Sequence, residues 1–328
     1  MKEIKANKLI VLLVAVMITL SGCSKDSSQE AVTENIYTIG ISQLAEHPAL
    51  NDTRLGFEDG LKELGVDAKI VYQNAQGDIP NSLSIAQKFA SDKVDLIFTI
   101  ATPAAQSAKQ ATSDIPILFS AVTDPVKSEI VADWVNVGGN ITGTSNRAPV
   151  ATQLKMFKEI DPSIKKIGVI YNTSESNSEI QLNELKILAP AEGLEIIAVG
   201  VTNVNEIAQA LDSLLTKVDA LYSVSDNLVA SSVELVSKKL LENNMISISN
   251  EESQVVGGLL ITNGLSYYEL GKQTAKMAKD ILVDKVGIST IPVEFAEKTN
   301  IKVNQKTLEA LGLDSNLPLF KDAVKVGE

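Results

Sequence analysis

Two stretches of the chain repeat one strand-then-helix unit: VDLIF at 94–98 before TPAA at 102–105, and VDALY at 218–222 before DNLV at 226–229. In both, the residue expected to open the helix lies eight positions after the valine, which makes Thr102 and Asp226 equivalent. Ligands of open parallel sheets bind beyond the carboxyl ends of the strands. A chain built from two such α/β halves has a cleft between them, and we expect function to lie there.

Outward from this repeat the chain alternates strands with helices, which is typical of parallel sheets with crossover helices. Strands are predicted at 36–41, 68–72, 96–100, 117–120, 141–144, 166–171, 194–199, 221–224, 246–249, 259–262 and 292–295. Helices are predicted at 48–64, 81–91, 152–160, 178–191, 204–215, 228–241, 267–282 and 305–311. The fold class is α/β, with two Rossmann-like lobes of parallel sheet joined by a three-segment hinge. We expect lobe 1 at 36–146 plus 265–290 and lobe 2 at 147–264 plus 291–328, the assignment of the C-terminal tail being open.

Residues 1–22 predict a secretory signal peptide. Three lysines precede an apolar run from residue 9 to residue 20, which is too short to span a bilayer comfortably. The sequence LSGC at 20–23 resembles a bacterial lipobox, which implies cleavage before Cys23 and a lipid on its sulfur. The polar residues that follow predict a flexible tether at 23–35. We therefore expect an extracytoplasmic protein that is lipid-anchored to the cell membrane; an uncleaved N-terminal anchor is the alternative.

The composition argues against several classes of protein. Without the four charged residues of the signal peptide, the 29 basic and 41 acidic residues fall to 26 and 40, and the resulting charge of −14 would repel nucleic acid. Cys23 is the only cysteine and His47 the only histidine, so a disulfide, a zinc site and a serine-protease triad are not expected. No Walker A sequence is present. We predict no enzyme activity, no metal and no cofactor, with a hydrolase that uses paired carboxylates as an alternative.

Polar residues end or follow the predicted strands of the first half, at the edge where a ligand would bind. Thr102 and Pro103 start a helix whose free N–H groups and dipole favour a carboxylate; a capped helix without a ligand is the alternative. For His47 a loop or cap role is favoured over a ligand contact. The ligand candidates from this half are Ser42, Gln43, Thr102, Pro103, Ser120 and Thr123.

The second half offers a carboxylate opposite this helix start. Asp226 is equivalent to Thr102 in the repeat, so the pair would suit a zwitterion, with the ammonium group on Asp226; a plain helix cap is the alternative. Asn250 and Glu251 also follow a predicted strand. One ring of the Tyr267-Tyr268 pair is expected to enter the cleft and the other to pack in the hinge. The ligand candidates selected here are Asn172, Asp226, Asn227 and Tyr267.

Five ordered motifs resemble the substrate-binding lipoproteins of ABC transporters, of the tryptophan/tyrosine-binding type. They are GISQLAEHPAL at 40–50, NAQGD at 74–78, IATPAA at 100–105, FSAVTDP at 119–125 and YYELG at 267–271. The resemblance covers essentially all of the chain after the signal peptide, and it implies the type I periplasmic-binding fold. The cleft positions of the family correspond to Ser42, Thr102, Ser120, Thr123, Asn172 and Asp226.

The resemblance implies a receptor that captures an amino acid-like solute, with an aromatic amino acid favoured, and delivers it to an ABC permease driven by an ATPase. We expect a monomer with no nucleic-acid partner. A ligand-sensing pair of lobes that reports to a membrane kinase is the alternative from the signalling class.

Overall fold

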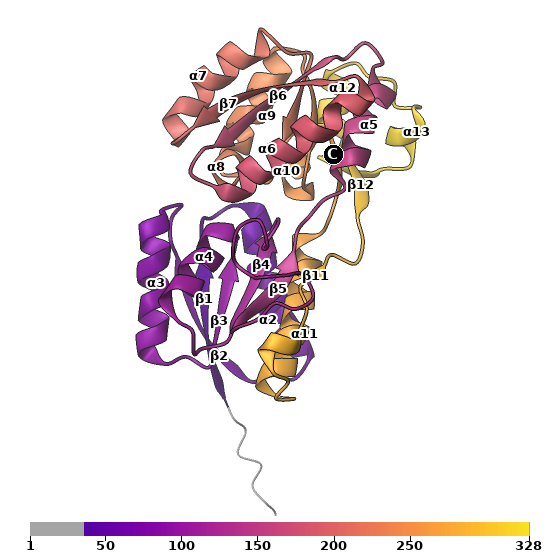
Figure 1. The fold of residues 1–328 in the computed structure, drawn as a ribbon. Helices are drawn as coiled ribbons and strands as arrows, with labels where there is room; N and C mark the ends of the chain where they lie inside the picture. Colours follow the sequence, from indigo (N-terminus) through magenta and orange to yellow (C-terminus); the bar gives the residue numbers. More distant parts are fainter. Residues whose placement is uncertain (1–35, 328) are drawn as a thin grey trace, which may run out of the picture. The chain divides into compact units, whose positions relative to one another are not determined.

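The computed structural model describes residues 36–327 (Figure 1). The predicted signal peptide, the tether and the lipidation of Cys23 lie outside the described residues and stay predictions. Between residues 36 and 327, none of the helices combines the length and apolar character needed to cross a bilayer.

Lobe 1 is a six-stranded parallel sheet in the order β11-β5-β4-β3-β1-β2. Its strands are β1 Tyr37–Gln43, β2 Ala68–Asn74, β3 Leu96–Ile100, β4 Ile117–Val122, β5 Ile141–Ser145 and β11 Glu294–Phe295. Its helices are α2 Pro48–Glu63, α3 Ile79–Asp92, α4 Thr102–Ala111 and α11 Tyr267–Leu282. The helices α2 and α11 share one apolar core with the sheet, and α3 and α4 share another. Every residue of β3 and β4 is buried, as expected for strands covered on both faces.

Lobe 2 is a seven-stranded sheet in the order β13-β12-β10-β9-β8-β6-β7. Its strands are β6 Lys166–Asn172, β7 Glu195–Val201, β8 Ala220–Ser223, β9 Ile246–Ser249, β10 Ile261–Gly264, β12 Asn300–Asn304 and β13 Val324–Val326. Its helices are α5 Val150–Ile160, α6 Ser176–Leu188, α7 Val204–Leu215, α8 Asn227–Ala230, α9 Val233–Glu242, α10 Glu252–Val256, α12 Gln305–Ala310 and α13 Pro318–Lys321. The helices α5 and α6 pack in one core cluster, and α7 and α9 pack in another. The predicted class of two α/β lobes is confirmed.

The repeated sequence has the same structural role in both lobes. The Asp95 carboxylate before β3 accepts a 2.7 Å hydrogen bond from Thr38 N in β1. The Asp219 carboxylate before β8 accepts 2.8 Å hydrogen bonds from Lys165 N and Lys166 N at the start of β6. Each aspartate therefore holds together the amino-terminal ends of two paired strands, at the opposite edge of the sheet from the cleft.

The third crossing between the lobes lies later in the chain than the sequence boundary at 290/291. The short strand β11 pairs with β5, which places residues 294–295 in the sheet of lobe 1. This segment is held there because Phe295 stacks on Trp134 with ring centroids 4.9 Å apart, and Val293 N donates a 2.9 Å hydrogen bond to Trp134 O. The crossings are therefore at 146–149, 265–266 and 296–299.

Two further details differ from the prediction. Strand β12 runs antiparallel to β10, so the sheet of lobe 2 is not wholly parallel. The helix predicted at 228–241 is broken at Ser231 and Ser232 into α8 and α9. The Ser231 hydroxyl group donates a 2.7 Å hydrogen bond to Asn227 O, the kind of local bond by which serine competes with a regular helix.

Candidate functional site

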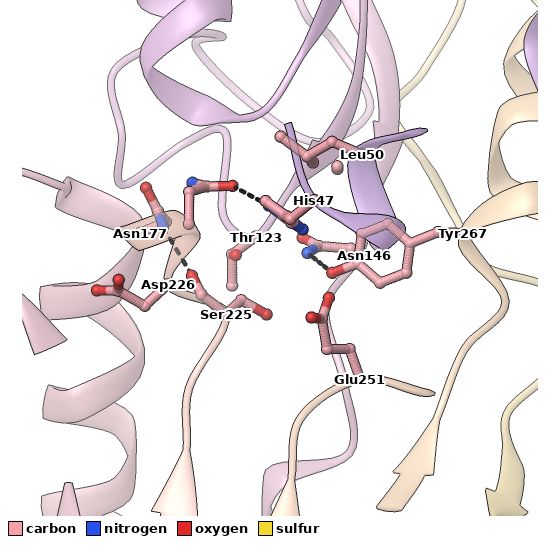
Figure 2. A pocket seen from close by; sticks show the side chains of 11 residues that line it. His47, Leu50, Thr123, Asn146, Asn177, Ser225, Asp226, Glu251 and Tyr267 are labelled. Atoms are coloured by element: carbon pink, nitrogen blue, oxygen red, sulfur yellow. Dashed lines mark hydrogen bonds between the residues drawn. The ribbon is translucent and has the colours of Figure 1, made fainter. Parts of the chain in front are cut away.

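A cavity of about 10 Å³ lies where carboxyl ends of strands from the two lobes approach each other (Figure 2), which is room for roughly one water molecule. Lobe 1 lines it with His47, Leu50, Ala121, Thr123, Asn146 and Tyr267. Lobe 2 lines it with Asn177, Ser225, Asp226, Asn227 and Glu251. The lining thus contains two carboxylates and neither lysine nor arginine.

The helices α2 and α11 both begin at this cavity. His47 occupies the N-cap position of α2, but its side chain makes no capping hydrogen bond. Its Nε2 atom instead lies 3.2 Å from Asn227 Oδ1 of lobe 2. His47 is therefore at the expected cap position, and it also forms a hydrogen bond between the lobes that the sequence did not indicate.

The two neighbouring tyrosines at the start of α11 have different surroundings. Tyr267 is 5% exposed, and its hydroxyl group accepts a 2.6 Å hydrogen bond from Asn146 Nδ2 (Figure 2). Burial and the negative charge of Glu251 raise the pKa of Tyr267, so the phenol keeps its proton. The hydroxyl group of Tyr268 donates instead to Asp59 of α2, at 3.1 Å. Tyr267 is therefore the ring that lines the cavity.

Asp226 is the N-cap of α8, as the alternative interpretation held, and it also lines the cavity. Its Oδ1 atom accepts a 2.9 Å hydrogen bond from Val229 N. Its Oδ2 atom accepts hydrogen bonds from Asn172 N at 2.5 Å and from the Ser178 hydroxyl group at 2.7 Å. Burial, followed by the charge of Glu175, raises the pKa of Asp226 despite these three donors.

Glu175 is a buried carboxylate that the sequence did not single out. It is 4% exposed and accepts hydrogen bonds from the side chains of Asn172, Asn177 and Asn227. Asn172, a predicted ligand residue, is therefore engaged within its own lobe. A second, larger cavity of about 460 Å³ adjoins this cluster and is lined by Asn172, Glu175 and Asn227, with lobe 1 residues on its other side.

Of the residues predicted for the site, Thr123, Asp226, Asn227 and Tyr267 line the inner cavity and Asn172 and Asn227 line the outer one. The others line neither of these two cavities: Ser42, Gln43, Thr102, Pro103 and Ser120. Gln43 Nε2 donates to Ala45 O at 2.7 Å and to Asn51 Oδ1 at 2.8 Å, so it braces the loop that carries His47. The Ser120 hydroxyl group accepts a 2.9 Å hydrogen bond from Thr144.

The helix α4 starts at Thr102 as predicted, but Thr102 is not its N-cap. Ala101 occupies the N-cap position with φ 86°, and Thr102 is the first helical residue. Among the described residues, the buried hydroxyl groups of Thr102 and Ser42 have no hydrogen-bond partner. An unpaired buried hydroxyl group costs free energy, so these two groups have hydrogen-bonding capacity that a ligand or a water molecule could use.

Several lining residues were missed because they belong to loops whose path depends on tertiary packing. Asn146 lies just past β5, and Asn177 lies in the first turn of α6. The only signal in the sequence is their position shortly after a predicted strand, which many surface residues share. Glu251 also follows a predicted strand, but that position alone does not select it as a ligand residue.

The family model described as ABC transporter substrate binding protein matches residues 38–327. A "Tyrosine-binding protein" of Clostridioides difficile is 42% identical in an alignment of 324 positions that covers 94% of this chain and 94% of that protein. A Streptococcus pneumonia structure of "the ABC domain in complex with L-Trp" is 31% identical with a TM-score of 0.85, covering 89% of this chain and 99% of that one.

The "ligand-free, open structure of CD0873, a substrate binding protein with adhesive properties" from Clostridium difficile is 44% identical. Its TM-score is only 0.69 over the same 89% of this chain and 99% of that chain. These matches confirm the resemblance predicted from the five motifs. The chain therefore belongs to the ABC transporter substrate-binding protein family, a family of extracytoplasmic solute-binding proteins that work with ABC transporters.

Proposed function

We propose that the two lobes close on an aromatic amino acid and present it to the permease of an ABC transporter, without chemical turnover. The observation that carries this proposal is the inner cavity, because both lobes line it and its lining combines carboxylates, amides and a tyrosine. The names of relatives that bind tyrosine and L-Trp support the choice of ligand class.

The ligand carboxylate is assigned to the start of α4. The first N–H groups of a helix have no partner within it, and the helix dipole is positive there. Thr102 and Ser42 add two buried hydroxyl groups without a partner among the described residues. We assign Ser42, Gln43, Thr102, Pro103, Ser120 and Thr123 to the lobe 1 wall of the proposed site, with Asn172, Asp226, Asn227 and Tyr267 completing it. Thr123 lines the inner cavity in this structure, and we expect the ligand to reach the other five residues of lobe 1 when the lobes separate.

Entry of the ligand requires the lobes to separate, because residues of both lobes enclose the inner cavity. The higher TM-score with the L-Trp complex, despite its lower identity, supports a closed arrangement in this structure. We assign the movement to rigid bodies at 36–145 plus 267–295 and at 150–264 plus 300–327, with the three crossings as the hinge.

A thermal unfolding screen against the twenty amino acids tests the ligand class. Protein should first be unfolded, dialysed and refolded to remove any solute that copurifies. We expect tyrosine, tryptophan or phenylalanine to raise the unfolding temperature, because a ligand that binds only the folded state stabilises it. Folded protein that none of the three stabilises would refute the proposal, and stabilisation by another amino acid alone would correct the ligand class.

We further propose that Cys23 carries a lipid that anchors a monomeric protein to the cell membrane, after removal of residues 1–22. Two or more acyl chains give stable membrane attachment, which a single chain does not. Cys23→Ser should therefore move the protein from the membrane fraction to the medium or the soluble extracytoplasmic fraction. Unchanged fractionation of the variant would contradict lipidation.

A further inference from the structure

We propose that Glu251, rather than Asp226, binds the ammonium group of the ligand. This inference rests on the proposed function, because it requires a ligand that has an ammonium group. It reassigns the role that the sequence repeat had suggested for Asp226.

The Asp226 carboxylate is largely occupied by donors from its own lobe. A carboxylate has about four lone-pair positions, and Asp226 receives Val229 N, Asn172 N and the Ser178 hydroxyl group. These bonds fix the start of α8 and join it to the end of β6. Burial and Glu175 also raise the pKa of Asp226, which makes it a weaker partner for a cation.

The Glu251 carboxylate has more free capacity and faces the cavity. Glu251 is 2% exposed, and although it occupies the N-cap position of α10, its side chain makes no capping hydrogen bond. The Ser253 hydroxyl group donates to Oε1 at 2.9 Å, and the Tyr267 hydroxyl group is a second donor to this carboxylate, against three donors for Asp226. Figure 2 shows the carboxylate pointing toward the Tyr267 hydroxyl group, beside Asn146.

The surroundings of Glu251 suit a group that only donates hydrogen bonds. An ammonium group has three donors and no acceptor. Asn146 Oδ1 is buried and without a partner in the described part of the chain, and it supplies a further acceptor beside Tyr267. Burial raises the pKa of Asp52 in α2, the charge of Lys302 lowers it and the charge of Glu251 raises it, so a carboxyl group of lobe 1 lies near enough to interact with Glu251 in this structure. Between residues 36 and 327, no lysine or arginine lines the cavity to compete for the ammonium group.

The test compares two matched variants, Glu251→Gln and Asp226→Asn, each of which replaces a carboxyl group by an amide of similar shape. Calorimetry would measure their affinities for L-tyrosine and for 3-(4-hydroxyphenyl)propionate, which lacks the ammonium group; L-tryptophan and indole-3-propionate serve if tryptophan binds more tightly. Thermal unfolding without ligand would check that each variant folds.

Glu251→Gln should weaken binding of the amino acid by about 30-fold or more, the change expected when a buried charge pair loses a partner worth about 2 kcal/mol. The affinity of Glu251→Gln for the analogue without the ammonium group should stay within about threefold of that of the unmodified protein. Asp226→Asn should lower both affinities by a similar factor. Equal losses for both ligands in Glu251→Gln, or selective loss of amino acid binding in Asp226→Asn, would overturn the inference.

A crystal structure of the unmodified protein with the amino acid keeps the inference testable if a variant does not fold. The ammonium nitrogen should lie within hydrogen-bond distance of a Glu251 carboxylate oxygen. A nitrogen bound to Asp226 and remote from Glu251 would overturn this inference but not the proposed function. If the unmodified protein bound no aromatic amino acid in calorimetry, the proposed function itself would fail, and the inference with it.

Discussion

Gly271→Ala should destabilise lobe 1, because Gly271 lies where α11 packs directly against the backbone of α2. A Cβ atom at Gly271 would lie 2.1 Å from Thr53 O and 2.8 Å from Phe57 N. The contact is reciprocal, since a Cβ atom at Gly56 would lie 2.0 Å from Tyr268 O. The two helices therefore lie closer together here than they could if Gly56 or Gly271 carried a side chain.

The sign of the effect follows from two opposing magnitudes. Replacing glycine by alanine inside a helix ordinarily stabilises it by roughly 0.5–1 kcal/mol. Carbon atoms and carbonyl oxygens approach to about 3.3–3.6 Å at the closest, so the helices would have to separate by roughly 1 Å. Overpacking of that kind costs typically about 1–3 kcal/mol and sometimes more. We therefore expect a net loss of at least about 1 kcal/mol in the free energy of unfolding.

Urea unfolding followed by circular dichroism would measure the change, with Gly287→Ala as the control. Gly287 has φ −65°, and a Cβ atom added there would have no neighbouring atom within 4 Å, so its replacement should not destabilise the protein. Ligand affinity should also fall in Gly271→Ala, because His47 and Tyr267 lie at the starts of the two helices that move apart. If the variant were as stable as the unmodified protein, or more stable, the close packing of α11 against α2 at Gly271 would be contradicted.

Two aspartates should show opposite dependence on pH. Asp219→Asn should lower the free energy of unfolding by about 1 kcal/mol at pH 7. The backbone hydrogen bonds from Lys165 and Lys166 lower the pKa of Asp219 below 3.8, so the difference should be present above about pH 4 and vanish as the pH falls further. Burial and Glu175 raise the pKa of Asp226 from 3.8 to about 7, so the folded state binds the extra proton in this range. The free energy of unfolding of the unmodified protein should therefore contain a contribution from Asp226 that decreases as the pH rises from 4 to 7. In Asp226→Asn this pH-dependent contribution should be absent. Urea unfolding at several pH values would check both, and identical pH profiles for a variant and the unmodified protein would contradict the corresponding prediction.

The fold was predictable because its signals are local. Alternating apolar strands and helices gave the positions of most elements, including Leu96–Ile100, Val204–Leu215 and Tyr267–Leu282 without any shift. The repeat was informative because Asp95 and Asp219 each bind the backbone of a neighbouring strand in the same way. The antiparallel strand β12 could not be predicted, because its pairing with β10 joins segments with α11 between them.

The site was only partly predictable, because the sequence shows which residues follow strands but not where their side chains point. Thr123, Asp226, Asn227 and Tyr267 line the inner cavity as expected. The sequence could not show that Asp226 is engaged by three donors, since Ser178 and Asn172 reach it only through tertiary packing. Nor could it distinguish Glu251 from the other acidic residues of the chain.

Small-angle X-ray scattering tests most directly whether the two lobes close on a small solute. Refolded protein free of solute would be measured alone and with a saturating amount of the aromatic amino acid that most raises its unfolding temperature. The ligand should reduce the radius of gyration and bring the scattering curve toward the one calculated from residues 36–327 of this structure. Identical curves with and without bound ligand would contradict closure of the lobes.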